Sequence, residues 1–394
     1  MKAKAISAIL SSMAILCFAT TYSQAQNTVG GLILEDVTWT FAGSPYIIVN
    51  DLTIEQGGSL LIEPGVEVRF EPMAKGSGYD QAKAELIVRG SLRVLGSSSL
   101  EKDVLLTSNA ERPLPGDWAG IRFERGGRGE LQYATIEYAD QGVCCYFTED
   151  VILEGNAIRY CTYSGISVHN SSAEITSNLI TDNRGHGLLA SSATLLVQGN
   201  LIADNEGHGI SWSNSDKKHS AISGNTINYN GLCGLYLYHF YGLVQGNYIA
   251  DNGRNGISVV QSECEVTNNQ VSDNANTAVF SYHSKPWIEH NQLTHNRVGI
   301  EARHQSEIQA HANNIYENTD YNALMSAALR AKVTGSVLLA DNNWWGGLDA
   351  QQASGTMLGF FLGPIQFLPL STSQFPFSLA RFYQSEAPPE KAEE

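Results

Sequence analysis

The stretch ITSNLITDNRGHGL at residues 175–188 decides the fold, because the chain returns to this phrase many times. Residues 197–210 read VQGNLIADNEGHGI, and residues 266–279 read VTNNQVSDNANTAV. A second asparagine column lies five residues after the first, from Asn183 to Asn318, with Cys161 in its first place. The first asparagine of the phrase recurs every 22 residues, with one step of 25, at Asn156, Asn178, Asn200, Asn225, Asn247, Asn269, Asn291 and Asn313. A fixed period of this length predicts a repeat architecture.

The residues between the asparagines identify the kind of repeat. Ile, Val or Leu stands two residues after each first-column asparagine, and a further aliphatic column runs from Ile166 to Ile300. These apolar sites lie in short, β-branched runs without a helical period, so three short strands per coil are expected. Leucine-rich repeats have a similar length but need several leucines per repeat, which this chain lacks. The sequence therefore predicts an all-β, single-stranded parallel β-helix with about 22 residues per coil and about 12–13 coils.

The asparagines are expected at the corners between strands. Asparagine tolerates the left-handed backbone conformation that tight corners require. Stacked side-chain amides can also hydrogen-bond from one turn to the next. We therefore predict that both asparagine columns combine left-handed corners with ladders of hydrogen bonds.

Residues 1–25 have the features of a secretory signal peptide. Lys2 and Lys4 precede an apolar run, which ends before Ser23, Gln24 and the small residue Ala25. This order is typical of a segment that is removed on export. We expect a periplasmic, cell-surface or extracellular protein.

The rest of the chain is expected to form one elongated domain over residues 26–370. Its coils are less regular over 45–130 and regular over 131–346, and residues 347–370 are expected to cap the open end. Residues 371–394 are expected to form a C-terminal segment that ends in an acidic disordered tail.

Several phrases outside the regular repeats carry a family resemblance. They are IEPGV at 62–66, GSL at 90–92, GDWAGI at 116–121 and DNNWWG at 341–346. With them the chain resembles the secreted right-handed parallel β-helix repeat proteins, whose coil is shared with pectate lyases and polygalacturonases. The resemblance covers roughly residues 45–346 and implies a right-handed coil, in agreement with the handedness of parallel crossovers. These phrases are specific for the fold and not for a function.

The composition limits the partners. A formal net charge of −16 argues against nucleic acid and anionic lipid. It also weighs against a polyanion such as pectate, unless calcium bridges the two. No run of 18 apolar residues predicts a membrane span. No zinc spacing or phosphate loop indicates a cofactor, and we expect a monomer.

The cysteines do not specify a disulfide by their spacing. Five of them follow the predicted signal peptide, which is an odd number. Cys144 stands 22 residues before Ile166, so we expect it to point into the coil as a small hydrophobic side chain.

Acid and base candidates occur together in two successive coils. Asp182 and His186 lie in one coil, and Asp204 and His208 lie in the next. Carboxylates on adjacent coils would lie about 5 Å apart, and a histidine beside a carboxylate suits acid/base catalysis. The GHG phrase resembles an active-site phrase of the polygalacturonases, but the other phrases of that family are absent. The alternative is that the aspartates are ordinary corner residues and that the histidines are tolerated variants of the repeat.

A ligand-binding candidate comprises outward-facing aromatic and charged side chains. Aromatic rings that stand out from a sheet offer flat apolar area for sugar rings or for a protein partner. The alternative is contact with a covering segment of the same chain. The candidate residues are Tyr236, Tyr238, Phe280, Tyr282, Trp287, Glu301 and Arg303.

Two classes of function remain open from the sequence. The first is a non-catalytic exported protein whose rod presents a polar and aromatic surface to a glycan or a protein. The second is a polysaccharide-active enzyme, a glycoside hydrolase, lyase or epimerase, that uses the Asp and His columns. The missing catalytic phrases favour the first class.

Overall fold

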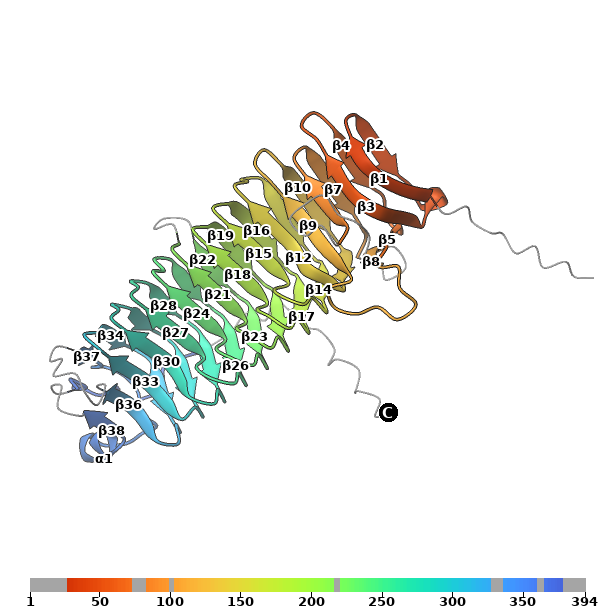
Figure 1. Cartoon of the computed structure of the whole chain (residues 1–394). Helices are drawn as coiled ribbons and strands as arrows, with labels where there is room; N and C mark the ends of the chain where they lie inside the picture. Colours follow the sequence, from red (N-terminus) through yellow and green to blue (C-terminus); the bar gives the residue numbers. More distant parts are fainter. Residues whose placement is uncertain are drawn as a thin grey trace, which may run out of the picture.

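The computed structural model describes residues 27–72, 83–98, 103–215, 220–326, 336–359 and 365–377. The predicted signal peptide and the acidic tail lie outside these residues. The described chain forms a rod of stacked turns in which every strand pairs in parallel with the strands of the neighbouring turns (Figure 1). One sheet has 13 strands, which corresponds to about 13 turns and confirms the predicted parallel β-helix.

Three faces run along the rod, which we call faces I, II and III. Face I consists of β6 (Glu85–Val88), β9 (Trp118–Phe123), β12 (Ala139–Tyr146), β15 (Ile166–His169), β18 (Leu188–Ser191), β21 (Ile210–Ser213), β24 (Leu235–Tyr238), β27 (Ile257–Val260), β30 (Thr277–Tyr282), β33 (Val298–Arg303), β36 (Tyr321–Ser326) and β38 (Met357–Gly359). Face II consists of β5 (Glu67–Phe70), β8 (Val104–Ser108), β11 (Ala134–Glu137), β14 (Ala157–Arg159), β17 (Leu179–Thr181), β20 (Leu201–Ala203), β23 (Thr226–Asn228), β26 (Tyr248–Ala250), β29 (Gln270–Ser272), β32 (Gln292–Thr294) and β35 (Asn314–Tyr316). Face III consists of β2 (Asp36–Trp39), β4 (Ser59–Ile62), β7 (Ser91–Leu95), β10 (Arg128–Gln132), β13 (Val151–Glu154), β16 (Ser172–Thr176), β19 (Thr194–Gln198), β22 (Ala221–Ser223), β25 (Leu243–Gln245), β28 (Glu265–Thr267), β31 (Trp287–Glu289), β34 (Glu307–His311) and β37 (Val337–Leu339).

The two ends of the described rod depart from this pattern. At the first end, β1 (Asn27–Ile33) and β3 (Tyr46–Ile54) are long strands, and β3 pairs with β5 through its first part and with β6 through its last part. A 3-10 turn (Phe41–Gly43) lies between β2 and β3. At the other end, a short helix α1 (Ala350–Gly355) precedes β38, which pairs with β36. Ile365, Phe367 and Leu370 pack against the core there.

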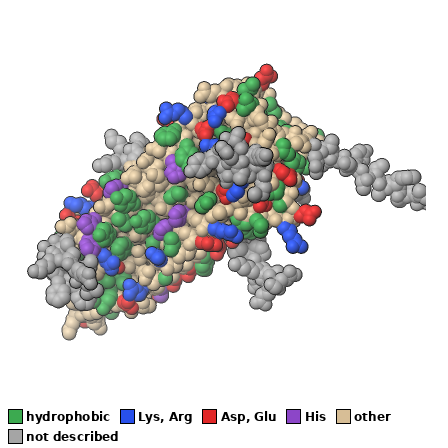
Figure 2. Space-filling model, viewed as in Figure 1, with side chains coloured by type: hydrophobic (Ala, Val, Ile, Leu, Met, Phe, Trp, Pro, Cys, Tyr) green, Lys and Arg blue, Asp and Glu red, His purple; other side chains and the backbone are tan. Residues whose placement is uncertain are grey.

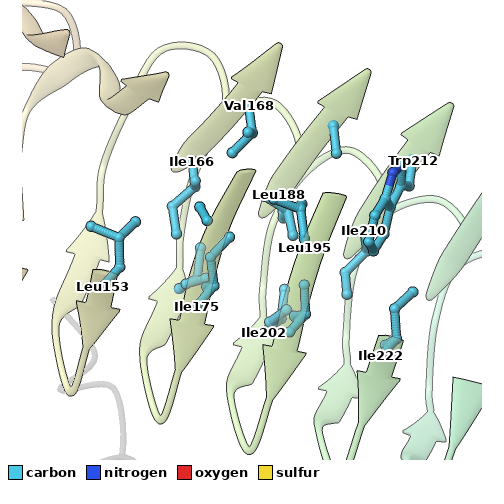
Figure 3. Close-up of a cluster of buried hydrophobic side chains, with 14 of the residues drawn as sticks. Leu153, Ile166, Val168, Ile175, Leu188, Leu195, Ile202, Ile210, Trp212 and Ile222 are labelled. Carbon is cyan, nitrogen blue, oxygen red and sulfur yellow. The ribbon is translucent and has the colours of Figure 1, made fainter. Parts of the chain in front are cut away.

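The inward side chains form one aliphatic column along the rod. Ile166, Leu188 and Ile210 follow one another on face I, and Ile175 lies opposite them on face III (Figure 3). Each of these side chains is fully buried, so every turn adds apolar contact only with its neighbours. The aliphatic columns that the sequence predicted as inward therefore form the core.

The asparagines stabilise the stack, but not in the conformation that the sequence suggested. Asn247 accepts hydrogen bonds from the backbone and side-chain N–H groups of Asn225. Its own side chain donates to Asn269 Oδ1 at 2.9 Å and to the Ile222 carbonyl. The left-handed backbone conformation belongs to the residue before each asparagine, such as Gly246, and not to the asparagine itself. The predicted ladders are confirmed, and the predicted left-handed asparagines are wrong.

Candidate functional site

Face I gathers the side chains with the most chemical character. Histidine and hydrophobic side chains, tyrosine included, lie together on the face that carries β15 to β30 in Figure 1, as Figure 2 shows. We call this set the aromatic stripe, and it comprises Tyr146, His169, His186, His208, Tyr236, Tyr238, Phe280 and Tyr282. It runs from β12 to β30, which is about 30 Å at about 4.8 Å per turn.

The four aromatics predicted from the sequence lie on two strands of this stripe. Tyr236 and Tyr238 are on β24, and Phe280 and Tyr282 are on β30. The strand between them, β27, carries the smaller Ser258 and Val260 in the same outward columns. All four rings are half-buried, so each keeps an exposed part for a ligand.

Glu301 and Arg303 continue these two columns on β33, and they contact the stripe as a pair. The Glu301 carboxylate is only 4% exposed and accepts hydrogen bonds from Arg303 Nη2 at 2.7 Å and from the Thr277 hydroxyl at 3.2 Å. Arg303 Cζ lies 5.3 Å from the centre of the Phe280 ring, within the range of a cation–π contact. Glu301 therefore holds Arg303 in place, and Arg303 is the member of the pair that a ligand can reach.

The two predicted catalytic histidines form a ladder. His186 Nδ1 accepts the backbone N–H of His208 at 2.9 Å, and His208 Nδ1 accepts the backbone N–H of Cys233 at 3.1 Å. The His186 and His208 rings stack with centroids 5.2 Å apart, and Tyr236 stacks on His208 at 5.0 Å. In the next turn but one, Asn255 Oδ1 accepts the Thr277 N–H in the same way.

Burial fixes the protonation of these rings. It lowers the pKa of His186, and burial together with the neighbouring His186 lowers the pKa of His208 to about 4. Because Nδ1 accepts a backbone proton in each ring, the ring proton is on Nε2. Near neutral pH both histidines are uncharged hydrogen-bond donors, and their basic nitrogen is already occupied.

The predicted catalytic aspartates occupy left-handed corners between face II and face I. Asp182 and Asp204 have φ values of 56° and 54°, and both are exposed. The same corner position holds Asp251 and Asp273 in later turns. Burial and the charge of Asp273 raise the pKa of Asp251. Aspartate tolerates this backbone conformation, which accounts for its recurrence at the corner.

Trp287 lies apart from the other predicted ligand-binding residues. It is on β31 of face III, pairs in register with Glu265 and Gln309, and is 39% exposed. It lines a separate pocket of about 410 Å³ with Glu263 and Lys285. The structure thus divides the predicted aromatic set between two faces.

Sequence reasoning missed a pocket of about 670 Å³ at the β6–β12 end of the aromatic stripe. We call it the charged pocket, and its polar and aromatic lining comprises Glu85, Arg122, Asp140, Gln141, Cys144, Tyr146 and Tyr163. Its floor depends on Gly120, whose φ of +125° and close approach to the Gln141 carbonyl leave no space for a side chain.

Ion pairs hold the walls of the charged pocket. Arg122 donates to both carboxylate oxygens of Glu85, at 2.6 and 2.7 Å, and to Glu124. Lys83 Nζ lies 2.6 Å from Asp140 Oδ2 on the other side. Among the residues that the structure describes, no group of three or more His, Cys, Asp or Glu side chains could hold a metal ion.

Cys144 shows why the pocket was missed. The sequence predicted that it points into the coil, but Val143 and Cys145 take the inward positions. Cys144 lies in the outward register with Ser167, and its thiol donates to Gln141 Oε1 at 2.8 Å. A bulge in β12 between Gln141 and Val143 shifts the spacing by one residue, so the 22-residue count fails there. Aligning Val143 with Ile166 would have placed Tyr146 in the outward column of Tyr238.

Comparisons with known proteins agree with this architecture. The chain matches the family described as right-handed β-helix region over residues 119–242 and 241–320, which together form half of the chain. No curated protein matches it in sequence. A variant of the periplasmic alginate epimerase AlgG is similar in structure, with a TM-score of 0.50 and 14% identity over 64% of this chain and 73% of that chain. The A-module of the Azotobacter vinelandii mannuronan C-5 epimerase AlgE6 is also similar, with a TM-score of 0.47 and 15% identity over 82% and 92% of the two chains. The chain belongs to the right-handed β-helix family.

Proposed function

We propose that the protein is an exported glycan-binding protein and that face I is its binding surface. The observation that carries this proposal is the aromatic stripe, which leads without a break in the stack from the charged pocket at β12 to β30. A polysaccharide chain lying along the rod would meet half-buried rings and hydrogen-bonding groups turn after turn. Tyrosine and histidine suit this task because each offers an apolar ring and a polar edge.

Retention on immobilised polysaccharides tests the proposal. A variant with Tyr236→Ala and Tyr282→Ala is expected to lose retention, because both rings lie at the middle of the stripe. Tyr248→Ala is the matched control, since Tyr248 is a half-buried tyrosine on β26 of face II. Equal retention of the parent protein and the double variant would overturn the proposal.

A polysaccharide-active enzyme is the second candidate, and the charged pocket is the observation that favours it. Asp140, Tyr146 and Tyr163 line one concave space, where a carboxylate and two phenols could act on a bound sugar. The assay is release of reducing ends or unsaturated sugars from a panel of glycans. If activity is found, Asp140→Asn is expected to abolish it, whereas Asp182→Asn with Asp204→Asn is expected to leave it intact. The reverse result would return the active site to the corner aspartates.

A further inference from the structure

The charge distribution of face I indicates which class of glycan it takes. On the floor of the face, each cation that lies beside the charged pocket or the aromatic stripe is held by a carboxylate of the same chain. Lys83 is paired with Asp140, Arg122 with Glu85, and Arg303 with Glu301. A carboxylate on a ligand would have to displace one of these partners and leave it without its counter-charge.

The histidines supply no positive charge to the floor either. Each Nδ1 atom accepts a backbone N–H of the next turn, so protonation of His186 or His208 would break a hydrogen bond of the stack. Their stacked rings expose edges rather than faces, and the Nε2–H group is an uncharged donor. A sugar hydroxyl can accept from this group and donate to a phenol oxygen of Tyr236 or Tyr238.

The border of face I adds negative charge. Six exposed carboxylates and three exposed arginines stand beside the second-column asparagines, at the corner that leads from face II. The carboxylates are Asp182, Asp204, Glu206, Asp251, Asp273 and Glu317, and the arginines are Arg184, Arg254 and Arg297. Arg297 is itself paired with Asp320 at 3.2 Å. The border therefore repels an anionic polymer that approaches the stripe.

We infer that the ligand of face I is an uncharged polysaccharide, recognised through its hydroxyl groups and ring faces, and that the face rejects polyuronates. This inference rests on the proposed glycan-binding function. Paired cations, neutral histidine donors and an acidic border all act in the same direction. Specificity against a polyuronate arises here from missing counter-charges as much as from attraction to the correct ligand.

Affinity electrophoresis of the full chain tests the inference with soluble polysaccharides cast in the gel. The neutral probes are hydroxyethylcellulose, xyloglucan, galactomannan and a mixed-linkage β-glucan, and the anionic probes are alginate and polygalacturonate. We expect retardation by at least one neutral probe and none by either polyuronate at low salt. Retardation by the neutral probe should persist in about 1 M NaCl, where the screening length is about 3 Å.

A matched variant examines the repulsion itself. Asp251→Asn with Asp273→Asn removes two border charges and keeps residue types that tolerate the left-handed corner. This variant should bind the neutral probe as the parent does. Retardation by a polyuronate but by no neutral probe would overturn the inference and leave the glycan-binding proposal standing. Retardation by none of the probes would overturn both.

Discussion

At the scale of single residues, the histidines show how a side chain can look catalytic in sequence and act structurally in the fold. His186 and His208 stand beside aspartates in a repeated phrase, which suggests acid/base chemistry. In the structure, each Nδ1 atom continues a hydrogen-bond ladder that Asn255 continues in a later turn. Their contribution to a binding surface is the opposite edge of the ring.

This ladder predicts a pH dependence of stability. The pKa of His208 is about 4 in the folded protein, whereas an unfolded histidine has a pKa of about 6.5. Between these values the unfolded chain binds the additional proton, so the free energy of unfolding should fall as the pH is lowered from about 6.5 to about 4. Above about 6.5 the contribution of His208 is fully present.

His208→Asn tests this assignment, because asparagine can accept the same backbone proton but does not titrate. Urea unfolding at several pH values should show a smaller loss of stability in the variant than in the parent over this range. An unchanged pH profile would show that His208 is not the titrating group.

The cysteines lead to a second prediction at the residue scale. All five cysteines in the described residues are buried and free, and burial raises the pKa of Cys144, Cys161 and Cys264 to about 12. Thiolate formation at neutral pH is therefore suppressed. A thiol reagent should leave these three unlabelled in the native protein and label them after denaturation. Rapid labelling of Cys144 in the native protein would mean that the charged pocket opens more widely than its walls indicate.

At the scale of elements, the asparagine columns connect each turn to the next. Asn247 is fully buried and uses its amide both as acceptor and as donor. Asn247→Ala would leave several buried groups of neighbouring turns unsatisfied, so we expect a loss of about 3 kcal/mol in the free energy of unfolding. Gln245→Ala is the control, because this exposed residue of the same turn should change stability by less than about 0.5 kcal/mol. Equal effects in urea unfolding would contradict a stabilising ladder.

The elements also show how far the sequence leads. The strand columns were predictable because the same apolar positions return every 22 residues and must share one buried column. The left-handed corner residues were misplaced by one position, because Gly, Ser, Asp, Tyr and His all occur there and conceal the pattern. Tyr236, Tyr238, Phe280 and Tyr282 could be grouped because they follow the register of the repeats. The charged pocket could not, since the β12 bulge breaks that register and Lys83, Arg122 and Asp140 are far apart in sequence.

At the scale of the whole molecule, the rod provides a long surface and little internal space. Each turn packs on its neighbours, so stability accumulates along the stack and outward positions are free to vary. No helix in the described part of the chain is long and apolar enough to span a membrane. Functional side chains can therefore collect on one face without cost to the core, as they do on face I.

A comparison of two single variants tests the glycan-binding face most directly. Isothermal titration with the polysaccharide that the parent protein binds would give the dissociation constants of Tyr236→Ala on face I and Trp287→Ala on face III. Loss of one ring contact in the stripe should weaken binding about 10-fold, equivalent to about 1.4 kcal/mol, because the ring supplies area and a polar edge. Trp287→Ala should bind as the parent does, since β31 faces away from the stripe in a different sheet. Unchanged binding by Tyr236→Ala together with lost binding by Trp287→Ala would contradict the account and move the site to face III.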